Sequence, residues 1–142
     1  TLESLAYNLQ SAKGIICSVM DARCAQVYNA LFKCDGEKLE RICKDRALSI
    51  AELCEELKGY NERIILVGDG AELCFNAMKE TLSNVELAPI NVRFQRASST
   101  AEIAIEKFNN GEVLSAAEIM PMYLRLPQAE RELKKKMEEK KC

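Results

Sequence analysis

The sequence contains no histidine among its 142 residues, and this absence excludes several kinds of chemistry. Histidine is the commonest general base near neutral pH, so a Ser-His triad and a histidine-based metal site are both excluded. Seven cysteines are present, but none forms a Cys-x-x-Cys pair, the usual spacing of a zinc site. Their odd number favours buried structural thiols in a reducing cytoplasm over a disulfide framework, with a reactive Cys24 as the alternative.

The chain also lacks an excess of basic charge and a long apolar run. Its net charge is −2, and its Lys and Arg residues are scattered, so it has no electrostatic footprint for nucleic acid. Any role near RNA is therefore expected to act through partners. No apolar run approaches the roughly 20 residues that a membrane-spanning helix needs. The chain does not begin with Met and shows no signal peptide, and we interpret it as a piece of a longer protein.

The region from Gly14 to Asp45 predicts a three-stranded antiparallel meander. Apolar runs at 15–20 and 26–32 are typical of strands that are covered on both faces. Asp35-Gly36 follows the second run, and Asp-Gly between strand-like runs is a strong hairpin signal because Gly accepts the positive φ of a tight turn. The third strand, about 38–46, carries many charges, which suits the edge of a sheet.

Helices and strands alternate after the meander. Ser49 to Glu52 is a capping-box sequence that opens a helix closed by Gly59. The apolar, β-branched run at 63–67 predicts a central parallel strand. A helix follows after residues 68–70, and a short strand at 85–88 stops at Pro89, which places it at an edge or an end.

Three further helices are expected. The apolar spacing at 2–11 predicts an amphipathic helix that ends at Gly14. A second capping box, Ser99-Thr100-Ala101-Glu102, predicts a helix that turns its apolar residues inward and ends at Gly111; those residues are Ala101, Ala104, Ile105 and Phe108. Pro127 suits the first turn of a terminal helix. The sum is an α/β fold of the ribonuclease H-like type, with a mixed five-stranded sheet and helices on both faces.

The candidate ligand-binding residues lie where two predicted strands end. Asp21 ends the first strand and Asp69 follows the parallel one, and ligands of open sheets bind at the carboxyl ends of strands. A carboxylate there could hold Mg²⁺ through water, and Gly68 and Gly70 could let a phosphate approach a helix N-terminus. The alternative is that Asp21 and Arg23 shape a hairpin corner and that the glycines form a tight turn. We favour this structural alternative for both features.

Three stretches together resemble one protein family. The hairpin Asp21-Ala22-Arg23-Cys24-Ala25-Gln26-Val27-Tyr28 is similar to the Asp-Ala-Arg-x-Gly-Glu-Val-Tyr hairpin of that family. Residues 1–6 resemble the start of its mid-chain helix. Pro121-Met122-Tyr123-Leu124-Arg125, with Ala129-Glu130, resembles its C-terminal signature. The family is the bacterial TsaB (YeaZ) family of tRNA threonylcarbamoyladenosine biosynthesis proteins, related to the glycoprotease fold within the actin, sugar kinase and Hsp70 superfamily.

The resemblance implies a domain organisation and a function. Residues 1–142 would be the second of two ribonuclease H-like domains, with 1–13 an inter-domain helix and 112–142 a C-terminal extension and helix. The protein would be a non-catalytic, cytoplasmic scaffold of the complex that forms N6-threonylcarbamoyladenosine at position 37 of tRNA. Its implied partners are a catalytic paralogue and a small ATPase, with a homodimer of the full-length protein also left open. It would contact tRNA only indirectly and would hold no cofactor itself, since ATP or ADP with Mg²⁺ would belong to the partner subunits or their interface.

The sequence departs from the family pattern in ways that bear on these expectations. The catalytic paralogue carries a His-x-Glu-Gly-His metal motif where this chain has Thr1 and Leu5, which argues against a metallopeptidase. Ala25 and Gln26 replace the Gly and Glu of the family hairpin. The main pairing helices of the family belong to the first domain, so this fragment is expected to lack the partner interface. The rival function is a nucleotide-binding or phosphotransfer enzyme that uses Asp21 and residues 68–70.

Overall fold

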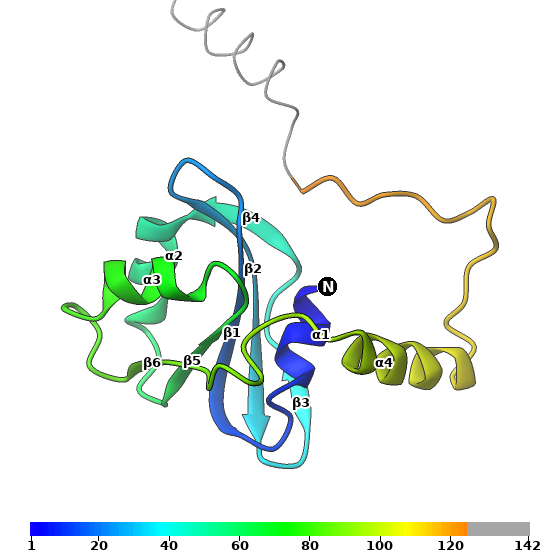
Figure 1. Cartoon of the computed structure of the whole chain (residues 1–142), viewed down its shortest axis with the longest axis horizontal. Coiled ribbons are helices and arrows are strands. Elements are labelled where there is room, and N and C mark those ends of the chain that lie inside the picture. Colours follow the sequence, from blue (N-terminus) through cyan, green and yellow to red (C-terminus); the bar gives the residue numbers. More distant parts are fainter. Residues whose placement is uncertain (125–142) are drawn as a thin grey trace, which may run out of the picture.

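The computed structural model describes residues 1–124, which form one mixed sheet flanked by helices (Figure 1). In chain order the elements are α1 (Leu2–Tyr7), β1 (Lys13–Asp21), β2 (Gln26–Asp35), β3 (Leu39–Arg41), β4 (Arg46–Ser49), α2 (Ile50–Leu57), β5 (Ile64–Val67), α3 (Ala71–Met78), β6 (Val85–Leu87) and α4 (Ala97–Asn109). The terminal helix expected from Pro127 lies outside the described residues.

The sheet joins an antiparallel half to a parallel half. Its strand order is β3-β2-β1-β5-β6, and β4 also pairs with β2. β1 and β2 are antiparallel over their whole length, from Lys13 opposite Asp35 to Asp21 opposite Val27. β1 then pairs in parallel with β5, and β5 with β6, through crossovers that contain helices. This topology confirms the predicted meander followed by β-α-β units.

The sheet has six strands instead of five, because the expected third strand is interrupted. The backbone amides of Ile42 and Cys43 both donate to the carbonyl of Leu31, at 2.8 and 3.4 Å, which breaks the regular ladder. Arg41 and Asp45 pair across the interruption, with Nη1 2.6 Å from Oδ1. The predicted strand at 38–46 is therefore wrong as one element. Its first part is β3, and β4 begins at its end.

Each face of the sheet buries its own apolar cluster. Alternate residues of β1 point to opposite faces, as strand geometry requires. Cys17 and Val19 belong to the cluster beneath α2 and α3, together with Leu53, Leu57, Leu66, Cys74 and Met78. Ile16 belongs to the cluster beneath α1, together with Leu2, Leu5, Phe32, Ile65 and Val67. Helices on both faces are thereby confirmed.

A buried polar chain fastens β4 and α2 to the sheet. The Asn29 side chain is fully buried, and its Nδ2 donates to the carbonyl of Ser18 at 3.0 Å. Its Oδ1 accepts from Nε and Nη2 of Arg46, at 3.2 and 3.1 Å. Arg46 in turn pairs with Glu56 at 2.7 Å. The hydrogen bonds of Asn29 and the ion pair of Arg46 offset the cost of burying these polar groups.

The helix ends test the predicted caps. At α2 the box is confirmed, because the Ser49 side chain accepts from the Glu52 amide while Glu52 reaches back to the Ser49 amide. At α4 the box is wrong. The helix begins at Ala97, and Ser99 donates its hydroxyl to Oδ1 of Asn8 at 2.6 Å. Gly14 also differs from expectation, since it lies inside β1 and does not end α1.

The predicted orientation of α4 is wrong as well. Ala101, Ala104, Ile105 and Phe108, expected to face inward, are all exposed. α4 packs on α1, and Figure 1 shows it extending beyond α1 on the side away from α2 and α3. The side of α4 that contacts α1 carries Glu102 and Lys107, which bond to Tyr7 and Glu3 of α1.

Candidate functional site

The carboxyl ends of β1 and β5 bring Asp21 and Asp69, the two candidate carboxylates, close together. The two strands run parallel, so both aspartates lie at the same edge of the sheet. The amide of Asp21 donates to Oδ1 of Asp69 at 3.3 Å. The Asp21 carboxylate accepts from the Arg23 amide at 2.7 Å, and its other oxygen is 3.8 Å from the Arg23 guanidinium. Both carboxylates thus accept hydrogen bonds from the backbone of the hairpin corner.

The glycines after β5 are required by the backbone of β1. Gly68 has φ +117°, and a Cβ built there would lie 1.9 Å from the carbonyl oxygen of Val19. A Cβ at Gly70 would lie 3.1 Å from the Asp21 amide. Their amides already have backbone partners, because Gly68 donates to Arg93 at 2.8 Å and Gly70 to Val19 at 3.3 Å. Close strand packing explains both glycines. Phosphate binding at residues 68–70 stays a prediction.

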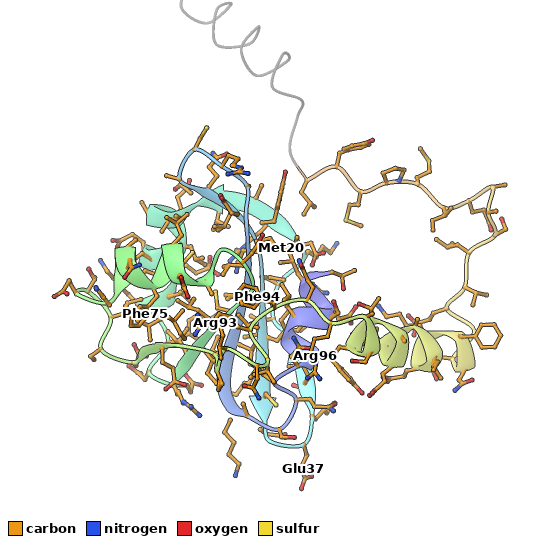
Figure 2. All side chains as sticks on the ribbon, in the orientation of Figure 1. Met20, Glu37, Phe75, Arg93, Phe94 and Arg96 are labelled. Carbon is orange, nitrogen blue, oxygen red and sulfur yellow. The ribbon has the colours of Figure 1, made fainter. Side chains whose placement is uncertain are left out.

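Arg93 is a part of this edge that the sequence did not reveal. Its side chain is only 11% exposed and pairs with Glu72 in the first turn of α3, Nη1 to Oε1 2.6 Å. Its Nε donates to the carbonyl of Ala88 at 2.8 Å. Figure 2 shows Arg93 and Phe94 on the connection that passes beside α1 towards α4. The residue lies between elements, where neither helical nor strand periodicity marks it.

The hairpin corner between β1 and β2 has an uncommon backbone. Arg23, Cys24 and Ala25 have φ values of 65°, 54° and 54°, so three successive non-glycine residues are left-handed. The amide of Gln26 donates to Arg23 at 3.1 Å, and the carbonyl of Ala25 accepts from Ile50, the first residue of α2, at 3.0 Å. Because glycine adopts this conformation without a steric penalty, the Gly of the family pattern fits the Ala25 position physically.

The two ends of the family signature meet at one cavity. Tyr28 of the hairpin motif and Tyr123 and Leu124 of the C-terminal motif line a cavity of about 260 Å³. Met20 and Asp45 also line it. Arg23 lies apart, exposed at the hairpin corner. Arg125 and Glu130, the remaining signature residues, lie outside the described residues.

The thiols differ in accessibility. Cys17 is fully buried, and this burial raises its pKa well above the usual range. Burial, and secondly the charge of Asp21, raises the pKa of Cys74 to about 12. Both thiols are therefore neutral near pH 7 and unreactive as nucleophiles. Cys24 is exposed at the hairpin corner.

Thr1 and Leu5, which the resemblance aligns with the paralogue's metal ligands, have structural roles in this fold. The Thr1 side chain caps α1 by accepting from the Ser4 amide at 3.1 Å. Leu5 is fully buried in the apolar cluster beneath α1. Within residues 1–124, no cluster of three or more Cys, Asp or Glu side chains is placed to hold a metal ion. Over the same residues, no helix has the length and apolar character to cross a bilayer.

The strand order and the helices on both faces define the class of fold. A mixed sheet in the order β3-β2-β1-β5-β6 with helices on both faces is a ribonuclease H-like arrangement. No protein-family model matches the chain. The tRNA threonylcarbamoyladenosine biosynthesis protein TsaB of Bacillus subtilis (strain 168) is 28% identical over 131 residues, covering 92% of this chain and 56% of that protein.

Two solved structures show the same fold. An uncharacterized Pseudomonas aeruginosa protein similar to peptidase YEAZ matches 87% of this chain and 56% of its own, with a TM-score of 0.66 and 16% identity. YeaZ from Pseudomonas aeruginosa matches 86% of this chain and 56% of its own, with a TM-score of 0.62 and 16% identity. The chain spans little more than half the length of these relatives. The comparisons confirm the resemblance to the TsaB/YeaZ family that the sequence motifs indicate.

Proposed function

We propose that the protein carrying this chain is a non-catalytic scaffold in the formation of N6-threonylcarbamoyladenosine on tRNA. The observation that carries this proposal is the relationship to TsaB, which extends over 92% of the chain. In this proposal the protein acts in the cytoplasm, with a catalytic threonylcarbamoyltransferase and a small ATPase as its partners. A homodimer of the full-length protein remains a further partner to test, and contact with tRNA would be made through the other subunits.

The geometry of the sheet edge supports a structural role for Asp21 and Asp69. Asp69 accepts from the Asp21 amide, and Asp21 accepts from the Arg23 amide, so each carboxylate fixes the next part of the corner. A carboxylate that reacts or holds Mg²⁺ needs oxygen lone pairs directed at substrate or water. Here the hydrogen bonds of Asp21 and Asp69 instead fix the backbone of the hairpin corner.

The scaffold proposal is tested by reconstitution of the transfer reaction from purified subunits. We expect threonylcarbamoyl transfer to require the protein and to persist with its Asp21→Asn variant, because asparagine keeps the oxygen that accepts from Arg23. Asp69→Asn is the second variant, for the same reason. Asp21→Ala, which removes that acceptor, is the structural comparison. Loss of transfer with a folded Asp21→Asn protein would contradict the scaffold role.

The rival is a nucleotide-binding or phosphotransfer enzyme, and the meeting of Asp21 and Asp69 at a strand edge is the observation in its favour. Calorimetric titration of the protein alone with ATP and Mg²⁺ separates the two functions. The scaffold proposal expects no binding that depends on Asp21 and no hydrolysis without partner subunits. Micromolar binding that Asp21→Asn abolishes, together with turnover, would establish the rival.

A further inference from the structure

A groove lies between α2 and α3, the two helices that cover one face of the sheet (Figure 1). Its volume is about 840 Å³, and most of its lining is apolar. Three small side chains line it, those of Ala51 in α2, Ala77 in α3 and Ala25 in the hairpin corner. The exposed Leu73 of α3 lies beside them. A groove of this kind between two helices accepts a third helix that has large apolar residues along one face.

The groove opens at the hairpin end of the sheet. Ala25 belongs to the hairpin corner, and its carbonyl accepts from the first amide of α2 at 3.0 Å. The described chain ends at the same end of the sheet, because Leu124 lines a cavity together with Met20 and Tyr28, which face each other one pair before the corner. Figure 1 shows residues 112–124 passing from the end of α4 to this place. The chain therefore leaves the described structure close to the mouth of the groove.

The residues that follow have the sequence of a helix that would fit the groove. Ala129, Leu133 and Met137 recur every four residues, which is the spacing of one helix face. In a helix these three residues span about 12 Å, which equals the length of the eight residues of α2. The alanines that line the groove leave room for the large side chains of Leu133 and Met137. Segment and groove thus match in length and in side-chain size.

The charges of the segment and of α2 are also complementary. Residues 125–142 contain seven basic and four acidic side chains, although the whole chain has a net charge of −2. α2 contains three glutamates and no basic residue. Glu52 accepts from the amide and hydroxyl of Ser49, which are neutral donors, so its charge is retained. Glu55 pairs with Lys58 at 2.6 Å, both on the lining of the groove. A basic helix is therefore favoured over an acidic one beside α2.

We propose that residues 127–141 bind as a helix in the groove between α2 and α3 of the same chain. Five residues of extended chain, from Leu124 to Ala129, reach up to about 17 Å, which exceeds the spacing of about 10 Å between packed layers. The segment can therefore pass around the hairpin corner to the other face of the sheet. Leu133 and Met137 then cover the alanines of the groove, and the neighbouring lysines face α2. The proposal does not depend on the proposed function.

Photo-crosslinking in the 142-residue chain tests this binding. p-Benzoylphenylalanine in place of Leu133 should crosslink to α2 or α3 within the chain, and mass spectrometry of the peptides locates the crosslink. The matched control has the same group in place of Lys135, which lies on the opposite side of a helix and should give no crosslink to α2 or α3. Crosslinks from position 133 to α4, crosslinks between two chains, equal yields from both positions, or no crosslink at all would overturn the proposal.

A variant of the groove tests the fit. Ala77→Lys adds a long cationic side chain to the lining, and we expect the crosslink yield from position 133 to fall about tenfold, because both the volume and the charge of the groove change. Asn76→Lys is the control, at an exposed position of α3 outside the lining, and should leave the yield unchanged. Circular dichroism checks that both variants keep the fold. A yield that Ala77→Lys does not lower would also overturn the proposal.

Discussion

Ala25 is the third of three successive left-handed residues at the hairpin corner. An L-residue with a side chain is strained there, because its Cβ approaches the neighbouring carbonyl oxygen. The corner is nevertheless held on both sides, since Arg23 and Ala25 both use their carbonyls as acceptors. The Gly of the related hairpin pattern therefore has a stereochemical reason, and its replacement by Ala has a measurable cost.

Ala25→Gly should accordingly stabilise the protein. Relief of the left-handed strain exceeds the extra flexibility that Gly gives the unfolded chain, and we expect a gain of up to about 1 kcal/mol in the free energy of unfolding. Urea denaturation measures it. The control is Ala51→Gly, an exposed position inside α2, where the same substitution should destabilise by about 0.5 to 1 kcal/mol. Equal effects at both positions would contradict the strain at the corner.

The buried thiols predict a loss of stability in alkali. An unfolded cysteine ionises near pH 8.5, whereas burial raises the pKa of Cys74 to about 12. Between these values the unfolded chain binds fewer protons than the folded chain, so the free energy of unfolding falls as the pH rises. Urea titrations between pH 7 and pH 10 measure the slope. Cys74→Ala should flatten it, whereas Cys24→Ala, at an exposed thiol, should leave it unchanged.

At the scale of single elements, α2 and α4 show when a capping sequence predicts the first residue of a helix and when it does not. Both have the sequence Ser-x-x-Glu, but of the two serines only Ser49 caps its helix. Ser99 lies inside α4 and bonds to α1. The difference arises because α4 begins at Ala97, two residues before Ser99. The connection before it is held by Asn8, whose Nδ2 donates to the carbonyls of Val92 and Phe94, both at 2.9 Å.

Ser49→Ala should therefore cost about 1 kcal/mol of unfolding free energy, since it removes the side chain that satisfies the Glu52 amide. Ser98→Ala, at an exposed position in α4, is the control and should change stability by less than about 0.5 kcal/mol. Hydrogen exchange at the first amides of α2 gives a local measurement. Unchanged protection at those amides in Ser49→Ala would contradict the cap.

Most elements were predictable from local pattern, and the exceptions have tertiary causes. The runs at 15–20, 26–32 and 63–67 are strands because their apolar residues fill both faces of a covered sheet. The interruption between β3 and β4 depends on two amides that share the carbonyl of Leu31, which no local pattern encodes. The orientation of α4 depends on polar partners in α1, more than 90 residues away for Ser99 and Asn8.

The same distinction holds at the candidate site. The meeting of Asp21 and Asp69 follows from parallel strands whose carboxyl ends share an edge, so the sequence could predict it. Arg93 could not be found in this way, because its position depends on how the connection after β6 folds back onto α3. The roles of Asp21, Gly68, Asp69 and Gly70 in ligand binding stay predictions until the titration is done.

At the scale of the whole molecule, β1 is the strand on which the two halves of the sheet depend. Its antiparallel partner β2 follows after four residues, 22–25, whereas its parallel partner β5 begins only at Ile64. The gap contains β2, β3, β4 and α2. β1 thus combines a local pairing, with β2, and a much more distant one, with β5.

This separation has a consequence for the order of folding. Closing a short loop costs less chain entropy than closing a long one, so the β1–β2 hairpin should form before β5 docks. We therefore expect Val27→Ala, in the hairpin, to slow refolding in stopped-flow experiments, and Leu66→Ala, in β5, mainly to accelerate unfolding. Both side chains are fully buried, which makes the pair comparable. The reverse assignment of rates would show that the parallel half nucleates, and that a chain still emerging during synthesis must wait for β5 before any of its sheet is stable.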